Sequence, residues 1–105
     1  AFATDFAKAT EQAKKDKKRV LVDFATTWCG PCKLMDQFVY TAEDVVRAAN
    51  DVVCIKLDGD VERELVKRFA VTAYPTMLLL DADLNEVRRE VGYQSVAAMV
   101  KFLTR

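Results

Sequence analysis

Two cysteines separated by two residues are the part of this chain best suited to chemistry. They lie in the sequence Trp28-Cys29-Gly30-Pro31-Cys32, directly after an apolar run, residues 19–26, that predicts a buried strand. Residues 33–40 follow and predict a helix. A Cys-x-x-Cys pair at a strand-to-helix junction is typical of a dithiol that opens and closes. The short spacing lets both sulfur atoms meet within one helical turn, as disulfide geometry requires.

The place of each cysteine in this motif predicts its role. Cys29 lies at the expected N-terminus of the helix, where unpaired N–H groups and the helix dipole favour an anion and lower the pKa of a thiol. We therefore expect Cys29 to be the nucleophile and Cys32, one turn further along and more buried, to be the resolving thiol. Gly30 leaves room for a substrate backbone to approach. Pro31 has a fixed φ that suits the first helical turn and stiffens the loop.

The composition limits other chemistry at this dithiol. The chain has no histidine, which excludes Cys-His nucleophile pairs, Ser-His-Asp triads and histidine-ligated metals. Half of a zinc site is the structural alternative for the cysteine pair, but zinc normally takes four nitrogen or sulfur ligands and only Cys54 remains. We therefore predict no metal and no cofactor other than a redox-active Cys29–Cys32 disulfide. The acidic residues in the segment 58–62 lack the spacing of a calcium loop and indicate a helix start.

An aspartate in the middle of the apolar strand is a further candidate catalytic group. A buried carboxylate is costly unless it is paired, and burial is expected to raise the pKa of Asp23. Lys56, in the next apolar run at 52–57, is its natural partner. Asp23 then either accepts the proton of Cys32, through a water molecule, or belongs to a structural ion pair with no chemical role.

Two further residues have both a structural and a functional interpretation. Trp28 either forms a flat apolar wall beside the sulfur atoms or packs in the core. Cys54 lies in the apolar run Val52-Val53-Cys54-Ile55 and is expected to be a small buried hydrophobic residue, with a regulatory thiol as the alternative. The basic run at 14–19 is either a binding patch or the solvated end of a helix.

The length and charge of the chain limit its class. Its 105 residues suffice for one domain with one core, which we assign to residues 1–105. The 16 basic and 16 acidic residues give a formal net charge of zero, so nothing steers the chain toward nucleic acid or an anionic membrane. The apolar stretches are too short for membrane insertion. No signal peptide is visible, although the sequence begins at Ala1 rather than Met.

Hydrophobic periodicity gives the expected elements the order αβα(α)βαββα, an α/β arrangement in which helices cover a sheet. Besides the strand and helix that flank the motif, the expected helices are residues 4–17, 42–49, 61–69 and 96–103, and the expected strands are residues 52–57, 76–80 and 87–91. Alternation with charged residues places the last strand nearer the edge of the sheet.

These motifs, in this order, resemble the thioredoxin superfamily over nearly the whole chain. The matching residues are Val22-Asp23-Phe24, Trp28-Cys29-Gly30-Pro31-Cys32-Lys33, Lys56, Pro75-Thr76 and Val91-Gly92. The resemblance implies a thioredoxin fold, with a central mixed sheet of about four strands and helices on both faces. It also implies a protein disulfide oxidoreductase that acts on protein disulfides, takes electrons from a thiol or dithiol donor and works as a monomer.

The resemblance further implies a substrate-binding surface around the dithiol. The Tyr74–Pro75 bond is expected to be cis and to face the active site, where the backbone of Tyr74 pairs with an extended peptide. From the residues alone, Pro75 would be a plain turn-forming proline. The residues assigned to this surface are Trp28, Gly30, Pro31, Tyr74, Pro75 and Gly92.

Two departures from the usual pattern bear on partners and location. Ala25-Thr26-Thr27 replaces the usual Trp-Ala. Met35-Asp36, Val39-Tyr40 and the extra helix at 42–49 are similar to the C-terminal domain of the DsbD electron transporter. Many such domains are exported, so an exported or periplasmic location is expected over a cytoplasmic one. The alternatives are a redox-relay domain fed by a membrane electron transporter and a non-catalytic binding module with the same fold. Cys-Gly-Pro-Cys resembles the reducing members, and the direction, reductase or oxidase, stays open.

Overall fold

Five helices and four strands make up residues 2–105, which the computed structural model describes. The helices are α1 (Phe6–Asp16), α2 (Gly30–Phe38), α3 (Glu43–Ala48), α4 (Arg63–Arg68) and α5 (Val96–Thr104), and the strands are β1 (Arg19–Ala25), β2 (Val52–Asp58), β3 (Thr76–Leu80) and β4 (Glu86–Val91). The elements follow the order predicted from periodicity, and the α/β class is confirmed. Within the described residues, no helix is both long and apolar enough to cross a membrane.

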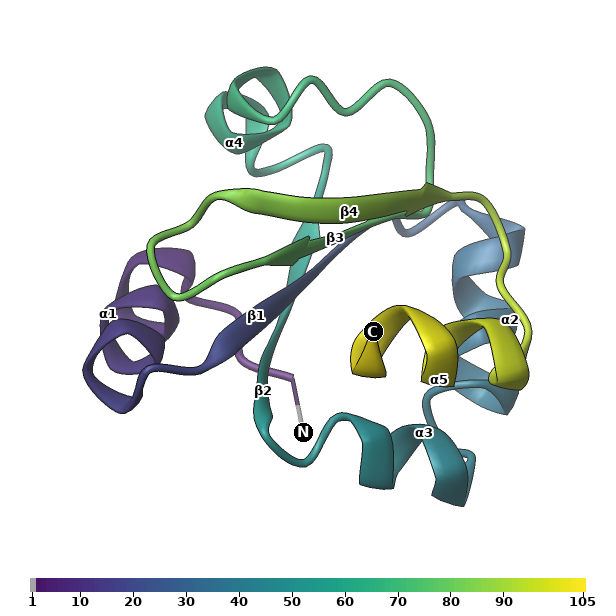
Figure 1. Ribbon diagram of the computed structural model, residues 1–105. Helices are drawn as coiled ribbons and strands as arrows, with labels where there is room; N and C mark the ends of the chain where they lie inside the picture. The colour runs from purple at the N-terminus through teal and green to yellow at the C-terminus, as the bar shows by residue number, and fades with distance from the viewer. Residues whose placement is uncertain (1) are drawn as a thin grey trace.

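The four strands form one mixed sheet in the order β2-β1-β3-β4 (Figure 1). Strand β1 runs parallel to β2 and antiparallel to β3, and β4 is antiparallel to β3 at the edge. Six of the seven residues of β1 are buried because helices cover both faces of this inner strand. Full burial explains why its sequence lacks the alternation of a half-exposed strand.

The two faces of the sheet carry separate apolar cores. Val20, Val22 and Phe24 of β1 pack in one cluster, to which α1 and α4 contribute. Leu21 points the other way and packs in a second cluster with residues of α2, α3 and α5. Figure 1 shows these last three helices gathered together, apart from α1 and α4. Because side chains alternate along a strand, Asp23 lies on the same face as Leu21, beneath α2.

The strand register brings distant segments together at one end of the strands. Ala25 at the end of β1 is paired with Asp58 at the end of β2, since these strands are parallel. Thr76 begins the antiparallel β3, and it lies beside Phe24 on one side and Val91 on the other. Four segments therefore lie together at this end of the sheet: the Cys-x-x-Cys motif, the acidic loop after β2, Tyr74–Pro75 and Gly92.

Helix α2 begins at Gly30 and ends at Phe38, so the predicted range of 33–40 is displaced by two to three residues. Cys29 itself is the N-cap, in an extended conformation with φ of −82°, and its Sγ accepts a hydrogen bond from the backbone N–H of Cys32. Pro31 fits the first turn, where a backbone N–H has no helical partner. Gly30, Pro31 and Cys32 thus form the first turn of α2, and Cys29 caps it.

Candidate active site

A disulfide joins Cys29 and Cys32 at the N-terminus of α2. Both residues are buried, each with only 3% of its surface exposed. The N–H of Cys32 donates to Cys29 Sγ at 3.2 Å, so a donor already faces the atom on which a thiolate charge would form. A Cβ atom at Gly30 would meet nothing within 4 Å, so the approach over this residue is open.

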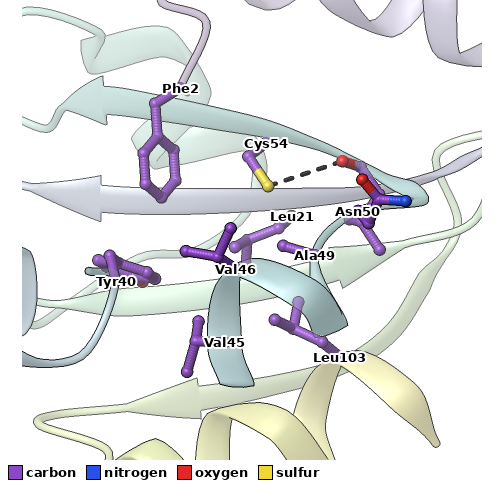
Figure 2. A pocket seen from close by; sticks show the side chains of 10 residues that line it. Phe2, Leu21, Tyr40, Val45, Val46, Ala49, Asn50, Cys54 and Leu103 are labelled. Atoms are coloured by element: carbon purple, nitrogen blue, oxygen red, sulfur yellow. Dashed lines mark hydrogen bonds between the residues drawn. The ribbon is translucent and has the colours of Figure 1, made fainter. Parts of the chain in front are cut away.

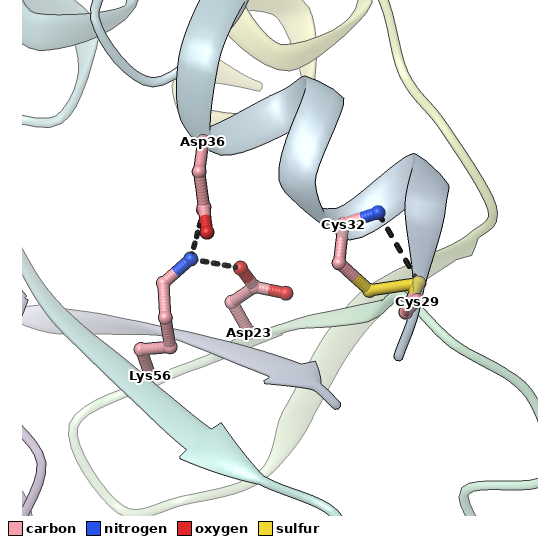
Figure 3. Close-up of polar contacts among 5 residues, drawn as sticks. All are labelled: Asp23, Cys29, Cys32, Asp36 and Lys56. Atoms are coloured by element: carbon pink, nitrogen blue, oxygen red, sulfur yellow. Dashed lines mark hydrogen bonds and ion pairs between the residues drawn. A yellow bond between two sulfur atoms is a disulfide. The ribbon is translucent and has the colours of Figure 1, made fainter. Parts of the chain in front are cut away.

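Asp23 and Lys56 are opposite one another in the register of β1 and β2. The Lys56 ammonium donates to Asp23 Oδ2 at 3.0 Å and also forms an ion pair with Asp36 of α2. Figure 3 shows the Asp23 carboxyl group between Lys56 and the disulfide, with its other oxygen pointing toward Cys32. That oxygen, Oδ1, is buried and has no hydrogen-bond partner in residues 2–105. This orientation suits a proton acceptor for Cys32, although that role stays a prediction.

The surroundings of this pair shift both pKa values. Burial raises the pKa of Asp23; the Lys56 charge and hydrogen bond only partly oppose the increase, and the negative charge of Asp36 adds to it. Burial alone would lower the pKa of Lys56, but attraction to Asp23 and Asp36 gives a net increase. Asp23 is therefore a stronger base than a surface aspartate, while Lys56 remains a cation.

Two aromatic rings complete the surroundings of Lys56. Its ammonium nitrogen lies 4.7 Å from the ring centroid of Phe2 and 5.0 Å from that of Tyr40. Burial also raises the pKa of Tyr40, and the negative charge of Asp23 adds to the increase. The Tyr40 hydroxyl is buried and finds no hydrogen-bond partner within the part of the chain described. Two carboxylates and two ring faces thus hold one ammonium group in place.

Trp28 is 67% exposed, so the interpretation that it packs in the core is wrong. Its indole N–H donates to Asp60 Oδ2 at 2.8 Å, in the loop that follows β2. Its ring also meets the Tyr74 ring edge to face, with centroids 6.0 Å apart and an interplanar angle of 88°. The indole N–H finds its acceptor on an exposed carboxylate, and this contact holds the ring at the surface, beside the cysteines.

The Tyr74–Pro75 peptide bond is cis, the isomer that the resemblance implies. Tyr74 packs against the cluster that contains Cys29 and Cys32. Gly92 has a φ of 89°, a conformation that favours glycine, and its N–H donates to the carbonyl of Pro75 at 2.8 Å. The structure therefore places Tyr74 against the dithiol and Gly92 against Pro75, and their part in substrate binding remains a prediction.

Comparison with known proteins agrees with this geometry. The family model described as Thioredoxin matches residues 3–105. The chain belongs to the thioredoxin family. The thioredoxin of Mycobacterium tuberculosis is 38% identical to it over 101 residues, which are 96% of this chain and 84% of that protein.

Solved thioredoxins share the fold. The crystal structure of thioredoxin NaTrxh from Nicotiana alata is 35% identical, covers 93% of this chain and 82% of that one, and superposes with a TM-score of 0.76. The solution structure of a thioredoxin from Thermus thermophilus is 26% identical, covers 95% and 82% of the two chains, and has a TM-score of 0.86.

This member of the thioredoxin family is a thiol–disulfide oxidoreductase, and its redox-active group is the Cys29–Cys32 disulfide. Thioredoxins act on protein disulfides and are served by reductase partners. Residues 2–105 contain no group of three or more His, Cys, Asp or Glu side chains arranged to hold a metal ion.

Two acidic residues of the site were not predicted from the sequence. Asp36 follows Cys32 by four residues, so both lie on one face of a helix. This spacing could have placed Asp36 near the dithiol, but it could not have shown the ion pair with Lys56. Asp60 belongs to the acidic segment 58–62, which indicated only a helix start. Its contact with Trp28 joins residues 32 positions apart, and no local pattern encodes such a contact.

Cys54 is half-buried rather than buried as expected. It lines a cavity of about 280 Å³ between β2 and α3, where Val46 and Ala49 lie across from it (Figure 2). The cavity explains why Cys54 is less buried than expected. The apolar pattern of a strand predicts which face is covered, but it does not predict a gap between that strand and the helix over it. Its thiol lies 3.7 Å from the Val52 carbonyl oxygen, and burial raises its pKa.

Proposed function

We propose that this protein reduces disulfides of protein substrates, with Cys29 as the nucleophile and Cys32 as the resolving thiol. The observation that carries the assignment is the hydrogen bond from the Cys32 N–H to Cys29 Sγ at the N-terminus of α2. In the reduced protein the same N–H and the positive end of the helix favour a thiolate at Cys29. Cys32 lies one turn inside the helix and is the less favoured site for a negative charge.

The reaction follows in two exchanges. The Cys29 thiolate attacks one sulfur of the substrate disulfide, that S–S bond breaks, and the other substrate sulfur leaves as a thiolate that takes a proton from solvent. Cys32 then loses its proton and attacks Cys29 Sγ in the mixed disulfide. The Cys29–Cys32 bond forms, the second substrate thiolate is released, and two electrons have passed from the protein dithiol to the substrate.

Asp23 is the proposed acceptor of the Cys32 proton. Its buried carboxyl group has a raised pKa, and one of its oxygens points toward Cys32 (Figure 3). A base with a raised pKa takes a thiol proton more readily than a surface aspartate does. Asp23 later returns the proton to solvent, and Lys56 remains its partner through both steps.

The proposed cycle needs an external electron donor, which we expect to be a thiol or dithiol because a thiolate reopens a disulfide by exchange. We also infer that the protein acts as a monomer, since Cys29, Cys32, Asp23 and Lys56 belong to one chain. An exported or periplasmic location stays a prediction that rests on the resemblance of residues 35–49. Size-exclusion chromatography and fractionation of source cells test these two inferences.

Insulin reduction tests the proposal. The reduced protein without a donor should open one insulin disulfide per molecule, and dithiothreitol should make the reaction catalytic. Cys29→Ser and Cys32→Ser should add nothing to the rate of dithiothreitol alone. Cys54→Ala, the matched control, should behave as the wild type. A wild-type protein that does not accelerate insulin reduction above the dithiothreitol rate would contradict the proposal.

A further inference from the structure

An exposed aromatic and acidic surface borders the disulfide. Trp28 and Val61 are 67% and 70% exposed, the two highest values among the large apolar side chains of residues 2–105. Exposed apolar groups that lie together with polar ones at the rim are typical of binding surfaces. Asp60, also exposed, lies next to Val61 in the loop after β2 and binds the indole of Trp28. We call Trp28, Asp60, Val61 and Tyr74 the Trp28 ledge.

The ledge is held in one arrangement before any substrate arrives. Trp28 is fixed from two sides, by its hydrogen bond to Asp60 and by its edge-to-face contact with Tyr74. The Asp60 backbone N–H in turn donates to Asp58 Oδ1 at 2.9 Å. A Cβ atom at Gly59 would overlap the Tyr74 ring, so glycine at this position lets the ring lie over the loop. A preorganised surface loses little entropy on binding.

The charge of the ledge is negative. The segment 58–62 contains Asp58, Asp60 and Glu62 and no basic residue. Arg63 follows it and donates to the Gly59 carbonyl, so one positive charge lies at this loop against three negative charges. Lys33 lines a cleft of about 390 Å³ together with Asp58 and Lys56. Asp60 forms no ion pair within residues 2–105, so its charge is available to a ligand.

We propose that the Trp28 ledge binds an arginine side chain of the substrate protein close to the cysteine under attack, an inference that rests on the proposed reduction of protein disulfides. A planar guanidinium stacks on the face of an indole and pairs with a carboxylate. The aliphatic stem of arginine covers an exposed apolar side chain such as Val61. A glutamate in the same place would meet the charge of Asp60 and be disfavoured.

The position of the ledge sets where the arginine must lie in the substrate. Trp28 directly precedes Cys29, and Tyr74 packs against the buried cluster that contains both cysteines. A side chain that reaches the indole face therefore belongs to a residue beside the substrate cysteine or one position further. The ledge would therefore influence which substrate disulfides are reduced, according to the residues beside the substrate cysteine. It takes no part in the thiol–disulfide exchange itself.

Two disulfide peptides that differ in one residue test the inference. One carries arginine beside the reacting cysteine and the other carries glutamine, and the reduced protein should show a kcat/KM about three- to tenfold higher for the arginine peptide. Because arginine also activates the nearby cysteine, each rate is divided by the rate with dithiothreitol. The preference should weaken at high ionic strength, since salt screens exposed charges.

Asp60→Asn isolates the charge, because an amide oxygen still accepts the indole hydrogen bond. This variant should bring the preference for arginine down to about twofold or less. Asp83→Asn, a neutralised acid in the turn between β3 and β4, is the matched control and should keep the wild-type preference. Equal reduction of both peptides by the wild type overturns the arginine site but leaves disulfide reduction standing. Failure to reduce either peptide overturns the proposed function and the site together.

Discussion

Burial raises the pKa of Asp23, and the sharing of Lys56 between Asp23 and Asp36 limits how far the lysine opposes that increase. The partner of Asp23, Lys56, was predictable from the sequence, because a buried carboxylate in one apolar strand needs a cation such as the amine in the neighbouring strand. The part played by Asp36 was not, because it depends on how α2 lies across β2. The structure shows Asp36 and Asp23 paired with the same ammonium group (Figure 3).

Asp36→Asn should lower the pKa of Asp23, because Lys56 then pairs with Asp23 alone and the repulsion from Asp36 is gone. Asp23 must be ionised to accept a proton, so the acid limb of the rate of mixed-disulfide resolution should move to lower pH. As a weaker base, Asp23 should also give a plateau rate about two- to fivefold lower. Asp36→Glu should restore the wild-type profile, and Asp44→Asn on α3 should not alter it. If the pH profile of mixed-disulfide resolution is unchanged in Asp36→Asn, Asp36 has no effect on that step.

Asp23→Asn should stabilise the oxidised protein at neutral and alkaline pH. The pKa of Asp23 is raised on folding, so the native state holds this proton more tightly than the unfolded chain does. The wild type therefore loses stability as pH rises through the folded pKa, and the variant does not. Urea unfolding of both proteins at several pH values should show a stability difference that grows with pH. A stability difference that is constant or shrinks with rising pH would contradict the conclusion that folding raises the pKa of Asp23. Lys56 keeps Asp36 as a partner in the variant, so no buried charge is left alone.

Cys54 should react slowly with alkylating reagents, because burial raises the pKa of its thiol and only the thiolate reacts. In the reduced native protein we expect labelling at least roughly tenfold slower than at Cys29. Mass spectrometry of peptides after timed quenching measures both rates, and urea should abolish the difference. Rapid native labelling of Cys54 would mean that the cavity beside α3 is open to solvent.

At the scale of elements, the boundaries follow from the residues that end them. Periodicity predicted each helix and strand, but α2 starts earlier than its apolar spacing indicates because the sulfur of Cys29 caps it. The two glycines of the site differ in backbone conformation. Gly30 lies in open space at the start of α2, while Gly92 has a left-handed φ and is hydrogen-bonded to Pro75.

Gly92→Ala should therefore destabilise the oxidised protein by about 1–2 kcal/mol, because a side chain disfavours a positive φ. Gly30→Ala is the matched control and should change the free energy of unfolding by about 1 kcal/mol or less, toward greater stability, since alanine favours a helix and meets no neighbour. Denaturant unfolding measures both. Equal effects of the two substitutions would contradict the conformational argument.

At the scale of the whole molecule, the sheet brings four segments together at one end of its strands, where β1, β2 and β4 end and β3 begins. The order of elements was predictable because each has a clear hydrophobic period. The strand order was not, because pairing β1 with β3 joins residues more than fifty positions apart, and only the resemblance implied a mixed sheet. The contacts of Trp28 with Asp60 and of Tyr74 with the cysteines depend on that order.

The central claim is that Cys29 attacks the substrate and Cys32 releases it. The most direct measurement is intact-mass spectrometry of reduced Cys32→Ser and reduced Cys29→Ser after each is mixed with a disulfide-bonded substrate protein. Cys32→Ser should accumulate a mixed disulfide at Cys29, because no thiol remains to resolve it. Cys29→Ser should accumulate little or none. Trapped substrate on Cys29→Ser, with none on Cys32→Ser, would reverse the two roles and contradict the account.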